Sequence, residues 1–162
     1  DNPLDVELRY NTSENHKKIA IAAAYMWKQA LGVKTHLINE EWKVYLQNRR
    51  HGQVTQVFCA SWISDYNDPY SFFELLYSKY GLNDTGYANP AYDALLGQAA
   101  AEGDLSKRTA HLQDAERLLL EDLPVLPVYF YVNKRLVKPY VSGWQPNIMD
   151  HHYTKFFKIL PH

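Results

Sequence analysis

The sequence predicts an α/β fold in which helices flank a mixed, mainly parallel sheet. Residues 5–10 alternate apolar and charged side chains, as in a strand with one buried face. A helical pattern over residues 13–31 follows, and then a β-type run over 33–38. This order favours parallel pairing through a right-handed crossover. A third apolar strand over 53–62 leads into an acidic, aromatic loop, where α/β proteins place their ligands.

The first two helices carry recognisable start and stop signals. Asn11-Thr12-Ser13 offers an N-cap hydroxyl, and Gly32 is well placed to end the first helix. The second helix is expected over residues 42–50, before Gly52. The expected apolar face of the first helix has three- and four-residue spacing and consists of Ile19, Ala22, Ala23, Met26, Trp27 and Ala30.

Three more helices are expected after the central loop. The first covers residues 71–80 and is apolar around most of its circumference, which indicates burial. The second covers 90–101, with Tyr92, Leu95 and Leu96 inward. The third is capped by Asp104 or Ser106 and ends before Pro124. Its expected apolar seam is Leu105, Leu112, Ala115 and Leu119.

Two strands are expected in the last third of the chain. Residues 125–133 are apolar and aromatic, and Pro127 places the start of the strand near Val128. Alternation puts Tyr129 and Tyr131 on one face and Phe130 on the other. A last strand is expected within residues 153–160.

Composition narrows the class of protein. A chain of 162 residues suits one domain with a real core, and 46% hydrophobic residues is a globular value. The net charge of −1 implies no nucleic-acid partner. The single cysteine, Cys59, excludes an internal disulfide framework and a Cys-rich metal site. Thirteen tyrosines suit a binding cleft, where one end of a side chain is apolar and the other wet.

Several blocks of the sequence resemble the periplasmic oligopeptide-binding proteins, which are solute receptors of ABC peptide importers. The stretch Ala-Ser-Trp-x-x-Asp-Tyr-Asn-Asp-Pro-x-Ser-Phe, residues 60–72, is similar to the signature loop of that family. Other blocks follow in the family's order: Leu8-Arg9-Tyr10-Asn11-Thr12-Ser13, Glu41-Trp42-Lys43, Pro90-Ala91-Tyr92-Asp93, Pro127-Val128-Tyr129-Phe130-Tyr131-Val132-Asn133 and Arg135-Leu136-Val137-Lys138-Pro139. The resemblance covers essentially the whole chain.

The resemblance implies a periplasmic-binding-protein-like lobe. Family members are about three times longer and fold as two lobes, and this chain resembles only their C-terminal third. Residues 1–133 would form the C-terminal ligand-binding lobe. Residues 134–162 would be a tail that crosses back to the N-terminal lobe, which is not part of this sequence. A signal peptide would lie upstream, so the resemblance places the protein in the periplasm of a Gram-negative bacterium.

The resemblance also implies a peptide-binding role for seven residues. Asp65 would pair with the α-ammonium of a peptide, and the backbone around Ser61 and Ile63 would extend the peptide as an added strand. Arg49 would meet a carboxylate or carbonyl. Apolar walls would come from Trp42, Trp62 and Tyr131.

Plainer interpretations of the same residues stay open. Asp, Asn and Pro are common turn formers, so the loop around Asp65 also reads as a surface turn. Arg49 and Arg50 also suit a solvated helix end, and Tyr131 also suits core packing. Close family members carry a second arginine where this chain has Cys59, which weakens a carboxylate clamp made of two arginines.

The sequence therefore predicts a solute-binding component of an ABC importer and not an enzyme. Its partners would be short peptides, the N-terminal lobe and the ABC permease in the inner membrane. The alternatives are a murein-peptide receptor of the same family or a peptide hydrolase with an unrecognised site. No cofactor, metal or catalytic residue is expected, because Asp150-His151-His152 lacks metal-site spacing and no nucleophile or phosphate-loop motif occurs.

Overall fold

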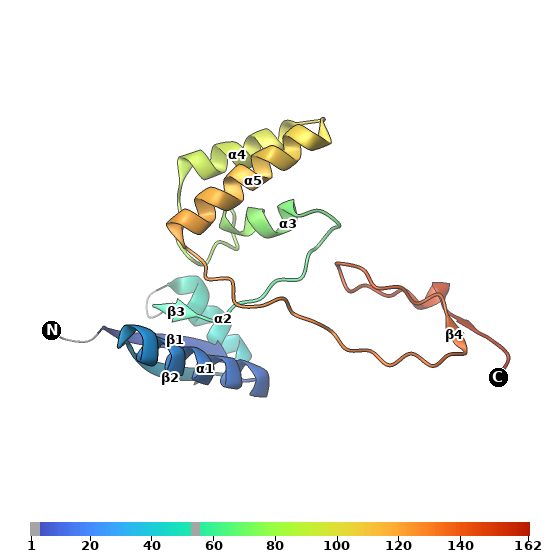
Figure 1. Ribbon diagram of the computed structural model, residues 1–162, viewed down its shortest axis with the longest axis horizontal. Coiled ribbons are helices and arrows are strands. Elements are labelled where there is room, and N and C mark those ends of the chain that lie inside the picture. Colours follow the sequence, from blue (N-terminus) through green and yellow to red (C-terminus); the bar gives the residue numbers. More distant parts are fainter. Residues whose placement is uncertain (1–3, 53–55) are drawn as a thin grey trace. The chain divides into compact units, whose positions relative to one another are not determined.

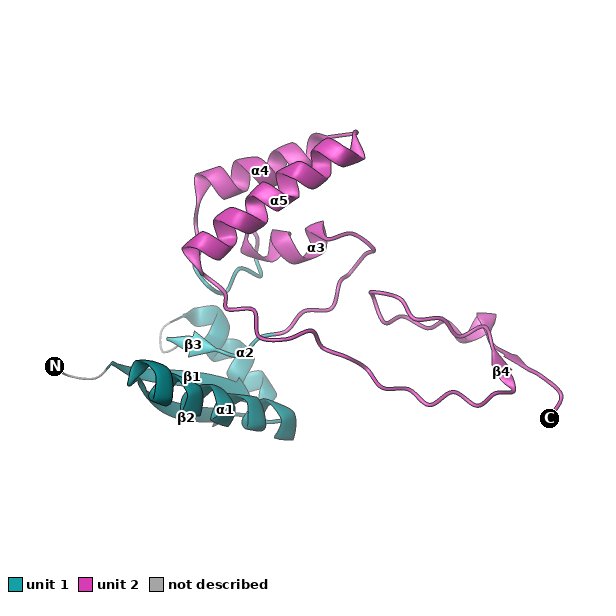
Figure 2. Ribbon diagram, in the orientation of Figure 1, with its two compact units in different colours: residues 1–60, 81–87 teal, residues 61–80, 88–162 magenta. Residues whose placement is uncertain are grey.

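Figure 1 shows the structure, a computed structural model that describes residues 4–52 and 56–162. Contacts between residues divide the chain into two compact units (Figure 2). The first unit comprises residues 1–60 and 81–87, and the second comprises residues 61–80 and 88–162. The expected start of the third strand, residues 53–55, lies outside the described residues.

The first unit contains a parallel sheet with strand order β2-β1-β3. Its strands are β1 (Asp5–Asn11), β2 (Lys34–Glu40) and β3 (Val57–Phe58). Leu8 of the central strand lies opposite Leu37 of β2 and Val57 of β3. The predicted strand-helix-strand unit with parallel pairing is confirmed.

Helix α1 (Glu14–Leu31) begins at Ser13, whose Oγ accepts the His16 N–H, and ends at Gly32 with φ 68°. Its buried residue Ala20 joins Leu8 and Tyr10 of β1 in one apolar cluster. The face is narrower than predicted, because Ala22, Met26 and Ala30 are exposed. With 3.6 residues per turn, each lies beside the stripe that Ala20, Ala23 and Trp27 form.

Helix α2 (Trp42–His51) begins at Glu41, whose carboxylate accepts the Lys43 N–H at 2.8 Å. Gly52 ends it in the left-handed conformation, with φ 61°. Tyr45 is its buried residue, and the Asn48 side chain donates to the Glu40 carboxylate at the end of β2. Glu40 also pairs with Arg9 of β1 at 2.5 Å, so polar contacts join the helix to the sheet.

The third strand is shorter than predicted. Within the described residues, β3 covers only Val57–Phe58, and its pairing with β1 ends where the Cys59 N–H donates to the Arg9 carbonyl at 2.8 Å. Among the residues that the structure describes, β3 is hydrogen-bonded to one neighbour only, as an edge strand is. No other strand in the described part of the chain takes up its backbone groups once it turns away from β1, so residues 60–62 are not a strand.

The second unit contains α3 (Tyr70–Phe73), the 3₁₀ turn η1 (Glu74–Leu76), α4 (Pro90–Ala101) and α5 (Leu105–Asp122). Figure 1 shows α4 and α5 side by side, and they pack on each other. Asn89 caps α4 and Asp104 caps α5. Both predicted helices are confirmed. The buried residues between them are Tyr92, Leu96, Ala99, Leu112, Ala115 and Leu119, while Leu105 is exposed against expectation because it lies in the solvated first turn.

The helix predicted over residues 71–80 is shorter than expected, and its last part is a 3₁₀ turn. The helical run ends at Leu76, and Tyr77 adopts extended backbone with ψ 130°. One residue later, the Ser78 N–H donates to the Asp93 carboxylate of α4 at 3.1 Å. This contact with α4 replaces a bond within the helix, so the prediction of a longer helix was wrong for a tertiary reason.

The strand predicted from Val128 is also absent. Within the described residues no strand pairs with it, and a strand needs a neighbour to take its backbone N–H and C=O groups. Phe130 is consequently 95% exposed. The expected last strand is reduced to β5 (Lys158–Ile159), which follows the 3₁₀ turn η2 (Thr154–Phe156) and pairs antiparallel with β4 (Val141–Ser142).

The observed elements agree with the predicted α/β class. The three-stranded sheet is wholly parallel, and β4 and β5 form a separate two-stranded antiparallel sheet rather than an antiparallel part of the same sheet. No helix within the described residues is both long enough and apolar enough to cross a membrane.

Candidate functional site

The loop between β3 and α3 holds its backbone through its own hydrogen bonds. The buried Ser64 hydroxyl donates to the Tyr66 carbonyl, which also accepts the Asp68 N–H at 2.8 Å. The Asp65 N–H donates to the Oγ of Ser71 at 3.1 Å, and Ser71 is fully buried. The part of the loop from Ser64 to Ser71 is therefore held by hydrogen bonds and is not a free surface turn.

The Asp65 backbone is held by a hydrogen bond, but within the described part of the chain its side chain is not. The residue is exposed, and within the described residues no hydrogen bond or ion pair engages its carboxylate. The neighbouring Tyr66 is occupied, since its hydroxyl donates to Glu74 at 2.8 Å. Burial and the Glu74 carboxylate raise the pKa of Tyr66, so this phenol stays neutral. Asp65 is thus a charged group on a fixed backbone, suited to bind a cation.

Asp68, the second acid of the loop, is already paired. Its Oδ1 accepts a hydrogen bond from Arg108 of α5 at 2.9 Å, and its Oδ2 lies 2.9 Å from the other terminal nitrogen of Arg108 in an ion pair. Its Oδ1 also accepts the Tyr70 N–H at 2.8 Å, at the start of α3. Burial acts to raise the pKa of Asp68, but the bonds from Arg108 and Tyr70 outweigh it and lower that pKa.

Other predicted residues of this loop are partly accessible. Ser61 and Ile63 are exposed, and Trp62 is half-buried. The Trp62 indole Nε1 is buried without an acceptor among the described residues. Tyr131 is exposed in the same unit, on a segment without regular secondary structure. Because Tyr131 is not packed in a core, its side chain is accessible to a ligand.

Arg49 lies in the first unit and is not a solvated helix end. Its Nε donates to Asp84 at 2.6 Å, and the two side chains are only 17% and 9% exposed. Its guanidinium also lies 5.7 Å from the ring centroids of both Tyr45 and Phe58. This pair fastens the segment 81–87 to α2, a connection that could not be predicted from the sequence.

The Tyr45 ring contacts both predicted site residues of this unit, Trp42 and Arg49. The exposed Trp42 ring stacks on Tyr45, with centroids 6.0 Å apart, and the Tyr45 hydroxyl donates to the Cys59 carbonyl. Burial raises the pKa of Tyr45 to about 12. Burial likewise raises the pKa of the Cys59 thiol, which packs against the apolar cluster of Leu8 and Tyr10. Cys59 thus serves packing at the position where relatives were expected to carry arginine.

The predicted site residues form two groups, one in each unit. Trp42 and Arg49 meet around Tyr45 in the first unit. Ser61, Trp62, Ile63 and Asp65 share the loop of the second unit. The sequence did not indicate three residues that support these groups: Ser71, Asp84 and Arg108. Asp68 before Pro69-Tyr70 carried a local turn signal, but nothing in the sequence pointed to an arginine 40 residues away.

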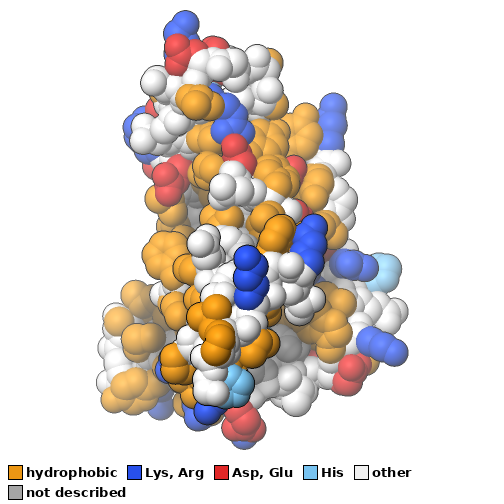
Figure 3. All heavy atoms as spheres, turned by 90° about the vertical axis from the view of Figure 1, so that its right-hand side faces the viewer, with side chains coloured by type: hydrophobic (Ala, Val, Ile, Leu, Met, Phe, Trp, Pro, Cys, Tyr) orange, Lys and Arg blue, Asp and Glu red, His pale blue; other side chains and the backbone are white. Residues whose placement is uncertain are grey.

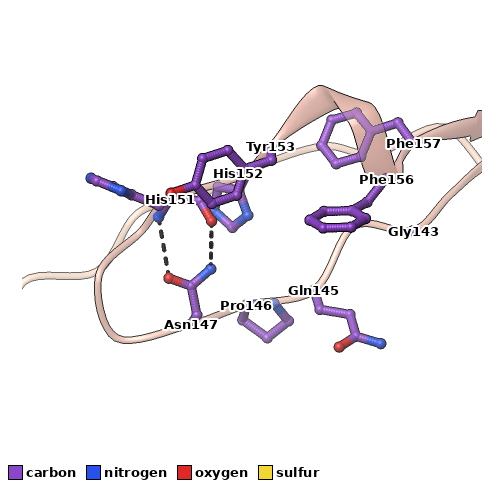
Figure 4. Close-up of a pocket in the computed structure, with 9 residues that line it drawn as sticks. All are labelled: Gly143, Gln145, Pro146, Asn147, His151, His152, Tyr153, Phe156 and Phe157. Carbon is purple, nitrogen blue, oxygen red and sulfur yellow. Dashed lines mark hydrogen bonds between the residues drawn. The ribbon is translucent and has the colours of Figure 1, made fainter. Parts of the chain in front are cut away.

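A hollow of about 400 Å³ lies elsewhere, in the segment between Gly143 and Phe157 (Figure 4). The Asn147 side chain exchanges two hydrogen bonds with the backbone of His151 there. The hollow contains none of the predicted site residues. Within the described residues, no group of three or more His, Cys, Asp or Glu side chains could hold a metal ion.

Comparison with known proteins identifies the family. Residues 2–84, about half of the chain, match the model of the bacterial extracellular solute-binding proteins, family 5 middle region. The chain therefore belongs to family 5 of the bacterial extracellular solute-binding proteins. The resemblance expected from the sequence is confirmed.

Two curated relatives match along the whole chain. The periplasmic murein peptide-binding protein MppA of Escherichia coli is 45% identical over 161 residues. The periplasmic oligopeptide-binding protein OppA of the same organism is 42% identical over 163 residues. The matches cover 99% and 100% of this chain but only 30% of each relative, so the chain spans about a third of their length.

Solved structures confirm the fold. The Escherichia coli murein tripeptide-binding protein MppA superposes with a TM-score of 0.85 at 43% identity. Haemophilus influenzae OppA, in a complex with RPPGFSPFR, superposes with a TM-score of 0.87 at 40% identity. Both cover 99% of this chain and 32% of the solved chain. The periplasmic-binding-protein-like α/β fold is thereby confirmed.

Proposed function

We propose that this chain is one lobe of a solute-binding protein that captures oligopeptides and delivers them to an ABC permease in the inner membrane. The observation that carries the proposal is Asp65, an exposed carboxylate on a loop fixed by hydrogen bonds. Membership of family 5 supports it, as do relatives described as oligopeptide- and murein peptide-binding proteins. Those relatives are binding proteins rather than enzymes, so the proposal contains no catalytic step.

Asp65 binds the α-ammonium group of the peptide in this proposal. A hydrogen bond between two charged groups is about twice as strong as a neutral one, and it strengthens where water is excluded. The backbone at the exposed residues Ser61 and Ile63 pairs with the peptide backbone, as an added strand does. The protein then reads the peptide's end and backbone, and it reads the side chains only loosely.

The remaining predicted residues supply walls and a second charge. The exposed rings of Trp42 and Tyr131 and the half-buried Trp62 offer apolar surface to peptide side chains. The Nε of Arg49 is engaged by Asp84. Arg49 therefore meets a peptide carboxylate or carbonyl only through its terminal nitrogens.

A second lobe completes the site in this proposal. Apolar side chains are exposed over the face drawn in Figure 3. Among all exposed apolar residues of the chain, those in the C-terminal segment include Leu126, Val128, Phe130, Val132 and Leu136. Such side chains need a partner surface. We assign residues 134–162 to the tail that packs on the N-terminal lobe, with the ligand-binding lobe ending near Asn133, and place the protein in the periplasm.

Sequence identity does not distinguish a murein-peptide receptor from an oligopeptide receptor. The murein peptide-binding relative is 45% identical and the oligopeptide-binding one 42%. Both classes hold a peptide, so the role of Asp65 is common to them, and only ligand competition distinguishes them.

The test uses a two-lobed protein, in which this chain replaces the matching segment of the Escherichia coli murein peptide-binding relative. That protein is incubated with a mixed library of tri- to pentapeptides and with a murein tripeptide, and retained ligands are analysed by mass spectrometry. The proposal predicts whole oligopeptides with free N-termini. Retention of the murein tripeptide alone would favour the other receptor class, and cleaved peptides would overturn the binding function.

A further inference from the structure

Helix α5 contacts the loop between β3 and α3, here called the binding loop, through Arg108. Its two terminal nitrogens each lie 2.9 Å from a different carboxylate oxygen of Asp68, which makes a two-pronged ion pair. The two side chains are 21% and 30% exposed, so water screens the pair only in part. The Arg108 guanidinium also lies 6.0 Å from the centroid of the Tyr70 ring. A long-range contact therefore holds the loop from one side.

Hydrogen bonds connect Asp68 to the rest of the loop. Its N–H donates to the Tyr66 carbonyl at 2.8 Å, and its carbonyl accepts the Ser71 N–H at 3.2 Å. Ser71 in turn accepts the N–H of Asp65 on its Oγ at 3.1 Å. A continuous series of contacts thus runs from Arg108 through Asp68 and Ser71 to the backbone of Asp65.

The Arg108–Asp68 pair makes the two acidic residues of the loop different, because in the described part of the chain a cation pairs with one of them and not with the other. Asp65 and Asp68 are three residues apart, and either could attract a peptide ammonium. Arg108 neutralises Asp68, while the Asp65 carboxylate has no partner among the described residues. A loop without Arg108 would present two competing anions and would lose the contact that holds Asp68 from outside the loop.

We propose that Arg108 is a positioning residue of the peptide site. It does not touch the peptide. By clamping Asp68 it fixes where Asp65 presents its carboxylate, and it keeps Asp68 from competing for the peptide's N-terminus. This inference rests on the proposed function, since it assumes that Asp65 binds the α-ammonium group.

Arginine suits this role better than lysine. A guanidinium can hold both oxygens of a carboxylate at once and lie against an aromatic ring, whereas an ammonium makes a single-point contact on a flexible stem. Arg108→Lys should therefore keep the positive charge but lose the two-pronged geometry. Peptide binding by this variant separates the contribution of the charge from that of the geometry.

The experiment measures two affinities in the two-lobed protein: for a tripeptide with a free N-terminus and for the same tripeptide acetylated. The variants are Arg108→Gln, Arg108→Lys and Asp68→Asn. The matched control is Arg117→Gln on the same helix, because its pair with Asp114 is 67% and 50% exposed. The thermal midpoint of each variant is measured alongside.

The expected result is a loss of discrimination between the two peptides. Arg108→Gln should weaken binding of the free peptide about tenfold, a part of what a hydrogen bond to a charged group contributes, with the acetylated peptide little changed. Arg108→Lys should fall between, and Arg117→Gln should match the wild type. If Arg108→Gln unfolds, hydrogen exchange in Arg108→Lys tests the inference instead. In that variant we expect faster exchange at the Asp65 amide than in the wild type, while exchange in α1 stays unchanged.

Two results would overturn the inference. The first is unchanged discrimination in Arg108→Gln or, where that variant is unfolded, unchanged Asp65 exchange in Arg108→Lys. The second is an equal loss for both peptides that follows the thermal midpoint, because this would mark a purely structural role. A wild type that binds both peptides equally would instead remove the Asp65 assignment, and with it this inference.

Discussion

The backbone N–H of Asp65 donates to the Oγ of Ser71 at 3.1 Å, while the Asp65 carboxylate remains exposed. Ser71 is fully buried, so the residue proposed to meet the peptide is held from inside the second unit. A fixed charged group binds a ligand at a lower entropic cost than a mobile one. The proposed affinity of the site therefore depends on Ser71 as well as on Asp65.

Replacing Ser71 by alanine should loosen this loop. The substitution removes the acceptor of the Asp65 N–H, and a lost hydrogen bond of this kind costs about 1 kcal/mol of unfolding free energy. We expect faster hydrogen exchange at the Asp65 amide and a lower urea midpoint. Ser106→Ala serves as the control, because Ser106 is exposed. Equal exchange rates in the two variants would contradict the role given to Ser71.

Replacing Asp65 by asparagine should weaken binding of peptides with free N-termini. The change keeps the size of the side chain and removes its charge, so the charge-assisted bond is lost. We expect an affinity loss of roughly tenfold to a hundredfold, from the value of a hydrogen bond to a charged group. Titration of the two-lobed protein measures it, with the exposed Asp114→Asn as control. Unchanged affinity would refute the assignment of Asp65.

The Asp68–Arg108 pair predicts a specific pH dependence. The folded-state pKa of Asp68 is lowered, so the pair adds stability above the unfolded pKa of about 3.9 and loses it as the pH falls through the folded pKa. Wild type should therefore lose more stability than Asp68→Asn between about pH 5 and pH 2. Urea unfolding of both proteins across this range measures the difference. Parallel pH profiles would show that the pair contributes nothing.

Sequence patterns predicted the parts of this fold that depend on neighbouring residues. Ser13 and Gly32 mark the ends of α1 because capping involves groups only a few residues apart. The parallel strands β1 and β2 followed from the alternation of apolar residues and from the helix between them. The residues proposed for the site came from the resemblance to a family, because local patterns alone left plainer interpretations of them open.

Contacts between distant residues could not be predicted in this way. Ser78 leaves the helical path because Asp93 accepts its N–H, and the sequence around residue 78 gives no sign of it. The strand expected from Val128 fails because strand formation depends on a neighbour and not on the residues alone. The partner of Arg49 was missed for the same reason, since Asp84 lies 35 residues away.

The Arg49–Asp84 pair should behave as a coupled unit. Both side chains are largely buried, so Arg49→Met or Asp84→Asn alone leaves one charge unpaired and should cost about 3 kcal/mol. The double variant should recover part of this loss, because it leaves neither charge unpaired. Urea unfolding of the four proteins gives the coupling energy, and the exposed neighbour Arg50→Met is the control. Additive losses would show that Arg49 is not committed to Asp84.

We propose that this chain supplies one wall of a two-lobed peptide site. Calorimetric titration with tri- to pentapeptides, run on this chain and on the two-lobed protein in parallel, is the decisive measurement. We expect tight binding by the two-lobed protein and weak or no binding by this chain, because one wall supplies only part of the contacts and does not exclude water. Tight binding by this chain alone would overturn the proposal, because its own surface would then form the whole site.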